Sequence, residues 1–286
     1  MREEKPSQTA SFVALARALA DDGITSIPGF SDPVARRLLS RGWSVAYRVL
    51  GRALGSPRRR ERAIARLDVI PLRVVAIDAE VQAALERGCR QLVILGAGLD
   101  SRAYRMASLR DVHVFEVDHP ATQAWKRRKA PATLARSLAF VAVDFERDSL
   151  AERLRASGFR ADEPTIWIWE GVVMYLTDAA LESTLADVGR LSAPGSTLLV
   201  HYHEPYEVTG AKEERSQRLL LAYWREPQIG RRLPEVMHEA VRRAGFEVAS
   251  DTRPSDWAKR AGSLVPTGLT AGVTHLLVAI RRAGAV

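Results

Sequence analysis

Short apolar runs alternate with helix-period segments along the chain from residue 91 to its end. The apolar runs predict strands at Gln91–Leu95, Val112–Val117, Phe140–Val143, Thr165–Trp169, Thr197–Tyr202, Phe246–Ser250 and Thr274–Ile280. The segments between them predict helices at Thr122–Lys129, Leu150–Ala156, Ala179–Leu191, Lys212–Trp224 and Leu233–Ala244. Such alternation is typical of an α/β fold, with a doubly wound, mostly parallel sheet and helices on both faces.

The first 70 residues carry a helical pattern instead. Apolar side chains recur at helical spacing over Thr9–Asp21, and Asp32-Pro33 is a helix start with a capping Asp and a Pro in the first turn. Gly51–Arg60 predicts an exposed break, and Pro71–Arg87 a further helix closed by Gly88. Because no convincing linker follows, we predict one domain over residues 1–286, with a helical cap (1–70) on a ligand-binding core (71–286).

Composition limits the class of protein. The chain has 286 residues, of which 47% are hydrophobic and 27% charged, values that exclude a disordered or fibrous protein. The longest apolar runs fall far short of the ~20 residues of a membrane helix, so we expect a cytoplasmic protein with no membrane partner. Cys89 is the single cysteine, which excludes an intrachain disulfide and a cysteine-based zinc site. No metal site is expected.

The net charge of +8 raises the question of nucleic acid. Two basic clusters stand out, Arg58–Arg60 with Arg62, and Lys126–Lys129. Neither is interleaved with aromatic residues for base stacking, and no nucleic-acid-binding signature accompanies them. We interpret them as solvated faces and do not expect nucleic acid as a partner.

A glycine-containing loop follows the first predicted strand. Gly96-Ala97-Gly98 lies where a parallel sheet places ligands, at the carboxyl end of a strand. Asp118 ends the next strand 20 residues beyond Gly98, the spacing expected of a carboxylate that holds ribose hydroxyls; Glu116, on the same side of that strand, is a second candidate. Ser101 replaces the third glycine of a dinucleotide loop. A ligand with a ribose but no pyrophosphate, such as S-adenosylmethionine, fits this pattern best.

Four motifs in order make the prediction more specific. They are QLVILGAGLDSRAYR over residues 91–105, Glu116-Val-Asp-His-Pro120, Asp144-Phe145 after the third strand, and Glu170-Gly-Val-Val-Met-Tyr-Leu176. They resemble the motifs of the leucine carboxyl methyltransferase family, which includes polyketide O-methyltransferases. The resemblance implies a class I methyltransferase, Rossmann-like fold of seven strands, with Thr274–Ile280 as an antiparallel last strand, and S-adenosylmethionine as cofactor.

The resemblance also implies roles for individual residues. The loop Gly96-Ala97-Gly98 would contact the methionine part of the cofactor, Asp118 its ribose, and Asp144 with Phe145 its adenine. Glu170 would face the cofactor's amino group. Arg73, 23 residues before the loop, would face its carboxylate. Arg17 would be the counterpart of a basic residue that the family carries near the N-terminus.

The acceptor decides whether a catalytic base is needed. A carboxylate is already ionised at neutral pH, whereas a phenol with a pKa near 10 benefits from a base. His201 and His203, at the end of the fifth predicted strand, are the candidate bases. Tyr175 is a candidate for orienting the acceptor. The charged segment Tyr206–Pro234 is a candidate lid over the acceptor site.

These features favour an O-methyltransferase acting on a hydroxyl or carboxylate of a small, polyketide-like molecule. Alternatives are a protein C-terminal carboxyl methyltransferase, a nicotinamide-dependent oxidoreductase and a cofactor-binding module without catalysis. A nucleic-acid methyltransferase is disfavoured, because Glu170-Gly-Val-Val stands where that class carries an Asn/Asp-Pro-Pro-aromatic motif. Monomer and homodimer are both compatible with the sequence.

Overall fold

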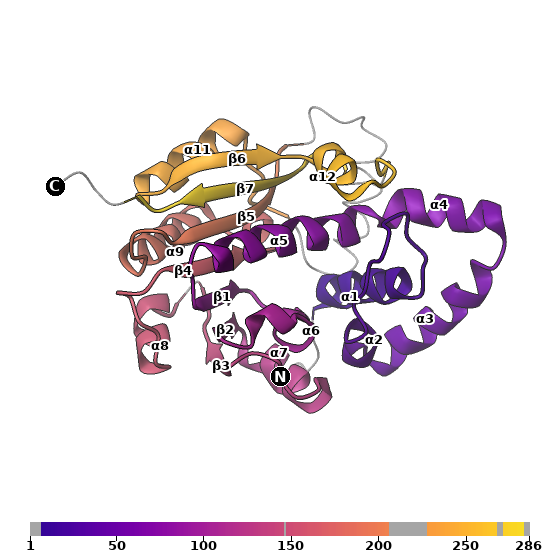
Figure 1. Cartoon of the computed structure of the whole chain (residues 1–286), viewed down its shortest axis with the longest axis horizontal. Helices are drawn as coiled ribbons and strands as arrows, with labels where there is room; N and C mark the ends of the chain where they lie inside the picture. The colour runs from indigo at the N-terminus through magenta and orange to yellow at the C-terminus, as the bar shows by residue number, and fades with distance from the viewer. Residues whose placement is uncertain (1–6, 146, 206–227, 268–270, 283–286) are drawn as a thin grey trace.

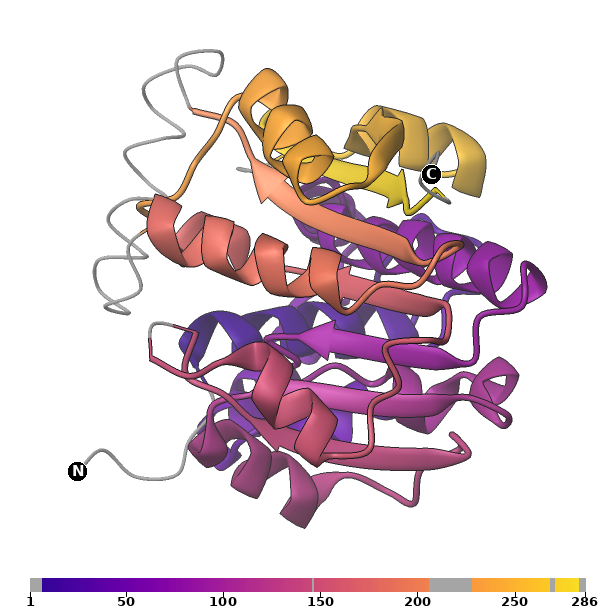
Figure 2. The ribbon, with the colours of Figure 1, turned by 90° about the vertical axis from the view of Figure 1, so that its left-hand side faces the viewer.

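Seven strands form one twisted sheet at the centre of the computed structural model, which describes residues 7–145, 147–205, 228–267 and 271–282 (Figures 1 and 2). The strands are β1 (Gln91–Leu95), β2 (His113–Asp118), β3 (Ser137–Ala142), β4 (Thr165–Trp169), β5 (Thr197–His203), β6 (Glu247–Thr252) and β7 (Thr274–Ile280). Their order is β3-β2-β1-β4-β5-β7-β6. The chain order reverses between β1 and β4, which places a ligand site at their carboxyl ends.

The register confirms the predicted sheet. Strands β1 to β5 pair in parallel, and β7 runs antiparallel between β5 and β6. All five residues of both β1 and β4 are buried, because helices cover both faces of the sheet. Trp167 and Trp169 are fully buried in this packing, as sheet-packing residues rather than ligand-stacking ones.

Side chains alternate between two hydrophobic cores along each strand. Leu92 and Ile94 of β1 face a core shared with the N-terminal helices, α5 and α12. Val93 and Leu95 face a second core shared with α8, α9 and α11. The two cores are the physical basis of the doubly wound arrangement.

The helices begin and end close to the predicted positions in the core and for α1, but not in the rest of the cap. They are α1 (Gln8–Asp21), α2 (Ala35–Leu38), α3 (Arg41–Ala53), α4 (Pro57–Leu67), α5 (Val69–Glu86), α6 (Arg102–Arg105), α7 (Pro120–Lys129), α8 (Leu150–Ala156), α9 (Asp178–Arg190), α11 (Pro234–Arg243) and α12 (Pro254–Ala261), with 3-10 turns η1 (Ala107–Leu109) and η2 (Val173–Tyr175). None of the described helices combines the length and apolar content needed to cross a bilayer.

Three predicted segments of the helical pattern differ from the structure or lie outside the described residues. The helix expected from Asp32-Pro33 is only the four-residue α2, and the break predicted over Gly51–Arg60 is mostly helical, since α3 runs to Ala53 and α4 starts at Pro57. Proline is favoured at the first position of a helix, so Pro57 begins α4 and does not belong to a break between helices. The predicted helix Lys212–Trp224, and most of the predicted lid, lie outside the described residues.

Candidate active site

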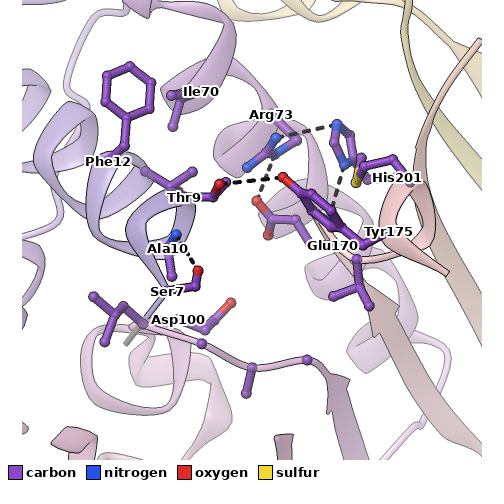
Figure 3. Close-up of a pocket in the computed structure, with 18 of the residues that line it drawn as sticks. Ser7, Thr9, Ala10, Phe12, Ile70, Arg73, Asp100, Glu170, Tyr175 and His201 are labelled. Carbon is purple, nitrogen blue, oxygen red and sulfur yellow. Dashed lines mark hydrogen bonds and ion pairs between the residues drawn. The ribbon is translucent and has the colours of Figure 1, made fainter. Parts of the chain in front are cut away.

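A cavity of about 1270 Å³ opens at the carboxyl ends of β1, β2, β4 and β5. It brings together all eleven residues predicted for the site: Arg73, Gly96, Ala97, Gly98, Asp118, Asp144, Phe145, Glu170, Tyr175, His201 and His203. Side chains of α1 form the opposite wall (Figure 3). The predicted residues therefore share one cavity, although they come from segments more than 100 residues apart.

The glycine loop has a backbone that only glycine accommodates well. Gly96 has φ +67°, and a Cβ there would lie 2.2 Å from Cγ2 of Val172. The backbone N–H of Gly98 donates to Oδ2 of Asp118, and that of His119 donates to Oδ1 at 2.6 Å. Burial raises the pKa of Asp118, while these two N–H groups oppose the rise. Asp118 thus fixes the loop and still lines the cavity.

Glu116, the second carboxylate considered for ribose, does not line the cavity. Its Oε2 lies 2.7 Å from Nζ of Lys126, and each side chain is only 1% exposed. Burial raises the pKa of Glu116 to about 7, against the lowering effect of Lys126. The alternation of side chains along β2 puts Glu116 on the same face as Asp118, but Lys126 of α7 covers that position.

A compact group of charges lies at the end of β4. Glu170 accepts from Nε of Arg73 at 2.7 Å and from Nη1 of Arg102 at 2.9 Å. Arg102 also donates to Asp78 at 2.7 Å and to Asp100. Burial disfavours the ionised form of Glu170, but the charges of Arg73 and Arg102 outweigh it and lower its pKa to about 2. Glu170 is therefore ionised at neutral pH.

Sequence reasoning missed Arg102, Asp100 and Asp78. Arg102 lies within the motif over residues 91–105, which was the one signal available for it. Its partners Asp78 and Glu170 come from α5 and the end of β4, so only the folded chain shows that Arg102 joins them.

The two histidines at the end of β5 differ in their contacts. Nδ1 of His201 accepts from the backbone N–H of Gly171 at 3.1 Å, and its Nε2 lies 3.3 Å from Nη1 of Arg73. His203 has Nδ1 3.3 Å from Oε1 of Gln228, which leaves Nε2 as its acceptor nitrogen. Burial lowers the pKa of His201 well below its usual range, as does the charge of Arg73. Burial, with Arg231, lowers the pKa of His203 to about 3.

Helix α1 contributes the wall that faces these groups. The hydroxyl of Tyr175 lies 3.4 Å from Oγ1 of Thr9, across the cavity (Figure 3). Arg17 donates to the carbonyl of Leu99 at 2.6 Å and to Oγ of Ser101 at 3.0 Å, and pairs with Asp32 at 3.0 Å. Arg17 thereby ties α1 to the segment that follows the glycine loop.

Sequence comparison places these residues in a known family. The family model described as leucine carboxyl methyltransferase matches residues 10–189. A relative from Mycolicibacterium paratuberculosis is 39% identical over 202 residues, covering 68% of this chain and 66% of the relative. One from Mycolicibacterium gilvum is 35% identical over 269 residues, covering 88% of this chain and 85% of the relative. Both relatives are named as S-adenosyl-L-methionine-dependent methyltransferases, and both names mark that activity as inferred.

Solved structures show the same fold at low sequence identity. A protein from Thermobifida fusca YX, described as an inferred methyltransferase, is 17% identical with a TM-score of 0.57, covering 98% of this chain and 96% of that one. A duf574 family protein from Streptomyces avermitilis is 17% identical with a TM-score of 0.58, covering 97% and 98%. With its class I methyltransferase fold and its match over residues 10–189, the chain belongs to the leucine carboxyl methyltransferase family of S-adenosylmethionine-dependent methyltransferases.

Proposed function

We propose that this protein transfers the methyl group of S-adenosylmethionine to an already ionised carboxylate oxygen of a small, largely apolar acceptor. The observation that carries the proposal is a cavity lined by both a group of charges and a set of apolar side chains, and at about 1270 Å³ larger than the ~300–1000 Å³ typical of a single-ligand pocket. Such a volume suits a cofactor together with an acceptor.

The charged side chains that line the cavity fit the cofactor's methionine part. Arg73 and Glu170 offer a cation and an anion side by side, a pattern complementary to an amino-acid carboxylate and ammonium. Asp118 would hold ribose hydroxyls, and Asp144 with Phe145 would hold adenine at the rim of the cavity. When bound, S-adenosylmethionine supplies an activated methyl group on a positively charged sulfur. The chain's task is then to hold the acceptor ~3 Å from that group and in line with it.

The apolar side chains that line the cavity suit an acceptor with a hydrocarbon body. They come from α1, α5 and the turn η2 with the residue after it, namely Phe12, Val13, Val69, Ile70, Val74, Met174 and Leu176. The hydroxyl of Tyr175 and that of Thr9 are the polar groups placed to orient a functional group there. We assign Tyr175 that orienting role.

The histidines favour an acceptor that needs no base. Nδ1 of His201 accepts from the backbone N–H of Gly171, so the neutral ring carries its proton on Nε2, and the one nitrogen that could act as a base is already occupied by a donor. His203 keeps an acceptor nitrogen, but a pKa of about 3 makes it a weak base for a phenol with a pKa near 10. We therefore assign the histidines to shaping the cavity and favour a carboxylate over a phenol.

Paired acceptors test this proposal. Carboxylic acids and the matched alcohols or phenols of the same hydrocarbon body are incubated with S-adenosylmethionine, and methyl ester or ether is quantified. We expect ester only, at a rate independent of pH between ~6 and ~9, because the acid is ionised throughout. Ether formation that rises with pH and exceeds ester formation would contradict the proposal.

The variant His203→Ala separates the two chemistries further. We expect kcat with the carboxylate acceptor to fall less than about tenfold, since a general base contributes roughly 100-fold or more where one is used. His113→Ala is the matched control, because His113 pairs with Ser137 away from the cavity. A fall of 100-fold or more in His203→Ala alone would show that His203 acts as a base.

A further inference from the structure

Helices α3 and α4 form a hairpin, residues 41–67, that projects from the rest of the fold (Figure 1). Neither helix has a buried residue. The hairpin contains eight arginines and one glutamate, a net charge of +7 in a chain whose net charge is +8. The basic character of this protein is therefore concentrated in about a tenth of its length.

The arginines of the hairpin lie on outward faces of both helices. Arg58, Arg62 and Arg66 recur every four residues along α4 and are exposed, while Ile64 and Leu67 on its other side pack against the core. Arg41, Arg48 and Arg52 follow a similar line along α3 and are exposed too. Most of the hairpin's charges are thus directed to solvent, whereas Arg60 reaches the carbonyl of Gly23 and Arg66 also lines the cavity.

An apolar ridge runs beside the arginines of α3. Val45 and Val49, four residues apart on one face of the helix, are 50% and 57% exposed, whereas Trp43 and Tyr47 on the inner side of the helix pack against the core. A cationic helix with an exposed aliphatic ridge is typical of helices that lie in the interface of a bilayer.

The arginines of the hairpin also lack acidic partners. Within the described ranges, none of the eight forms an ion pair; Arg48 and Arg60 donate instead to the carbonyls of Ser44 and Gly23. A solvated protein surface normally intersperses both signs of charge. A field of one sign, without internal partners, is complementary to an anionic surface.

We propose that the hairpin docks on an anionic lipid surface, with Val45 and Val49 at the headgroup boundary and the arginines on lipid phosphates. The aliphatic ridge decides against nucleic acid, because it has no role on a phosphate backbone and the hairpin's aromatic rings, Trp43 and Tyr47, pack inward.

The hairpin leads directly to the cavity. Arg66 and Leu67, at the end of α4, line it. Docking would therefore bring the cavity close to the lipid surface, which suits an acceptor with an apolar body. The docking surface itself does not depend on methyl transfer, so the two proposals fail separately.

Vesicle sedimentation of the full chain tests the docking. The vesicles are phosphatidylcholine alone, or phosphatidylcholine with about one third phosphatidylglycerol. We expect binding to the anionic vesicles only, weakened by high salt. The double variant Arg58→Glu with Arg62→Glu should lower the partition coefficient by about tenfold or more. Val45→Ser with Val49→Ser, which keeps the charge, should lower it by roughly threefold or more.

A matched control keeps the test specific to the hairpin. Arg155→Glu with Arg242→Glu makes the same change in net charge on α8 and α11, at exposed positions on the other face of the sheet. It should bind vesicles within about twofold of the unmodified chain. The unfolding temperature of every variant, measured without vesicles, reports whether the fold is intact.

Two results would overturn the proposal. One is equal binding to both kinds of vesicle, or an equal loss of binding in the control variant. The other is a hairpin-dependent complex with duplex DNA or with an acidic protein but not with anionic vesicles.

Discussion

Glu170 is a largely buried carboxylate held between two cations. Its carboxylate is 12% exposed and lies between the guanidinium groups of Arg73 and Arg102, which hold its pKa at about 2 against the effect of burial. An ordinary glutamate has a pKa of ~4.3, so the lowered value contributes about 3 kcal/mol to stability above that pH. Between pH 2 and 4 the unfolded chain binds more protons than the folded chain, so this contribution to stability is lost as the pH is lowered through that range.

We predict that Glu170→Gln destabilises the fold by roughly 3 kcal/mol at neutral pH, because it leaves two buried cations without their carboxylate. The difference from the unmodified chain should shrink as the pH falls below about 4.5. Urea unfolding across this pH range measures it. Glu182→Gln, at an exposed surface pair with Arg243, is the control and should change stability by less than about 0.5 kcal/mol. A difference that does not vary with pH would contradict the assignment.

Gly96 sets the geometry of the loop. We predict that Gly96→Ala costs roughly 2–4 kcal/mol, since it adds left-handed strain to a clash with Val172. Gly29→Ala is the matched control: Gly29 has φ +68° but no atom within 4 Å of the added Cβ, so it bears the strain without the clash. Chemical denaturation measures both variants. Equal losses in the two would show that the contact with Val172 is unimportant.

At the scale of elements, Arg17 ties α1 to Asp32 and to the segment after the glycine loop. Arg17 is 4% exposed and Asp32 is fully buried, so removing the guanidinium leaves a buried carboxylate without its main partner. We predict that Arg17→Met destabilises the chain by about 3 kcal/mol and raises amide hydrogen exchange in α1. Arg37→Met, at an exposed position of α2, should do neither. Unchanged exchange in α1 would contradict the tethering role.

Local patterns were enough to predict the core of the fold. β1, β4 and β7 begin and end where their apolar runs do, because a strand buried on both faces leaves its whole length apolar. β6 is displaced from its predicted position, since it is an edge strand with only intermediate burial. α12 was not predicted at all.

The sequence predicted the site residues that belong to a recognisable motif, but not those whose position depends on contacts with distant segments. Asp118 and Glu170 end strands, so their place at the cavity follows from the sheet. The pairing of Glu116 with Lys126, and of Arg102 with Asp78, joins segments whose contacts no local spacing encodes. Arg17, which belongs to α1, also lines the cavity.

The whole molecule separates two kinds of surface. The sheet and its helices form a cavity lined by charged and apolar side chains, while the hairpin of α3 and α4 carries most of the net charge. The family match spans most of the cap and most of the residues that line the cavity, whose role in binding S-adenosylmethionine is the claim on which the other assignments rest.

Thermal unfolding with S-adenosylhomocysteine, S-adenosylmethionine, NADH or buffer alone tests that claim most directly. A ligand at 100 times its dissociation constant adds ~2.7 kcal/mol, which should raise the unfolding temperature by ~5 °C. We predict this rise with the two sulfur-containing adenosyl ligands, its loss in Glu170→Gln, and no change with NADH. A rise with NADH and none with the adenosyl ligands would contradict the account.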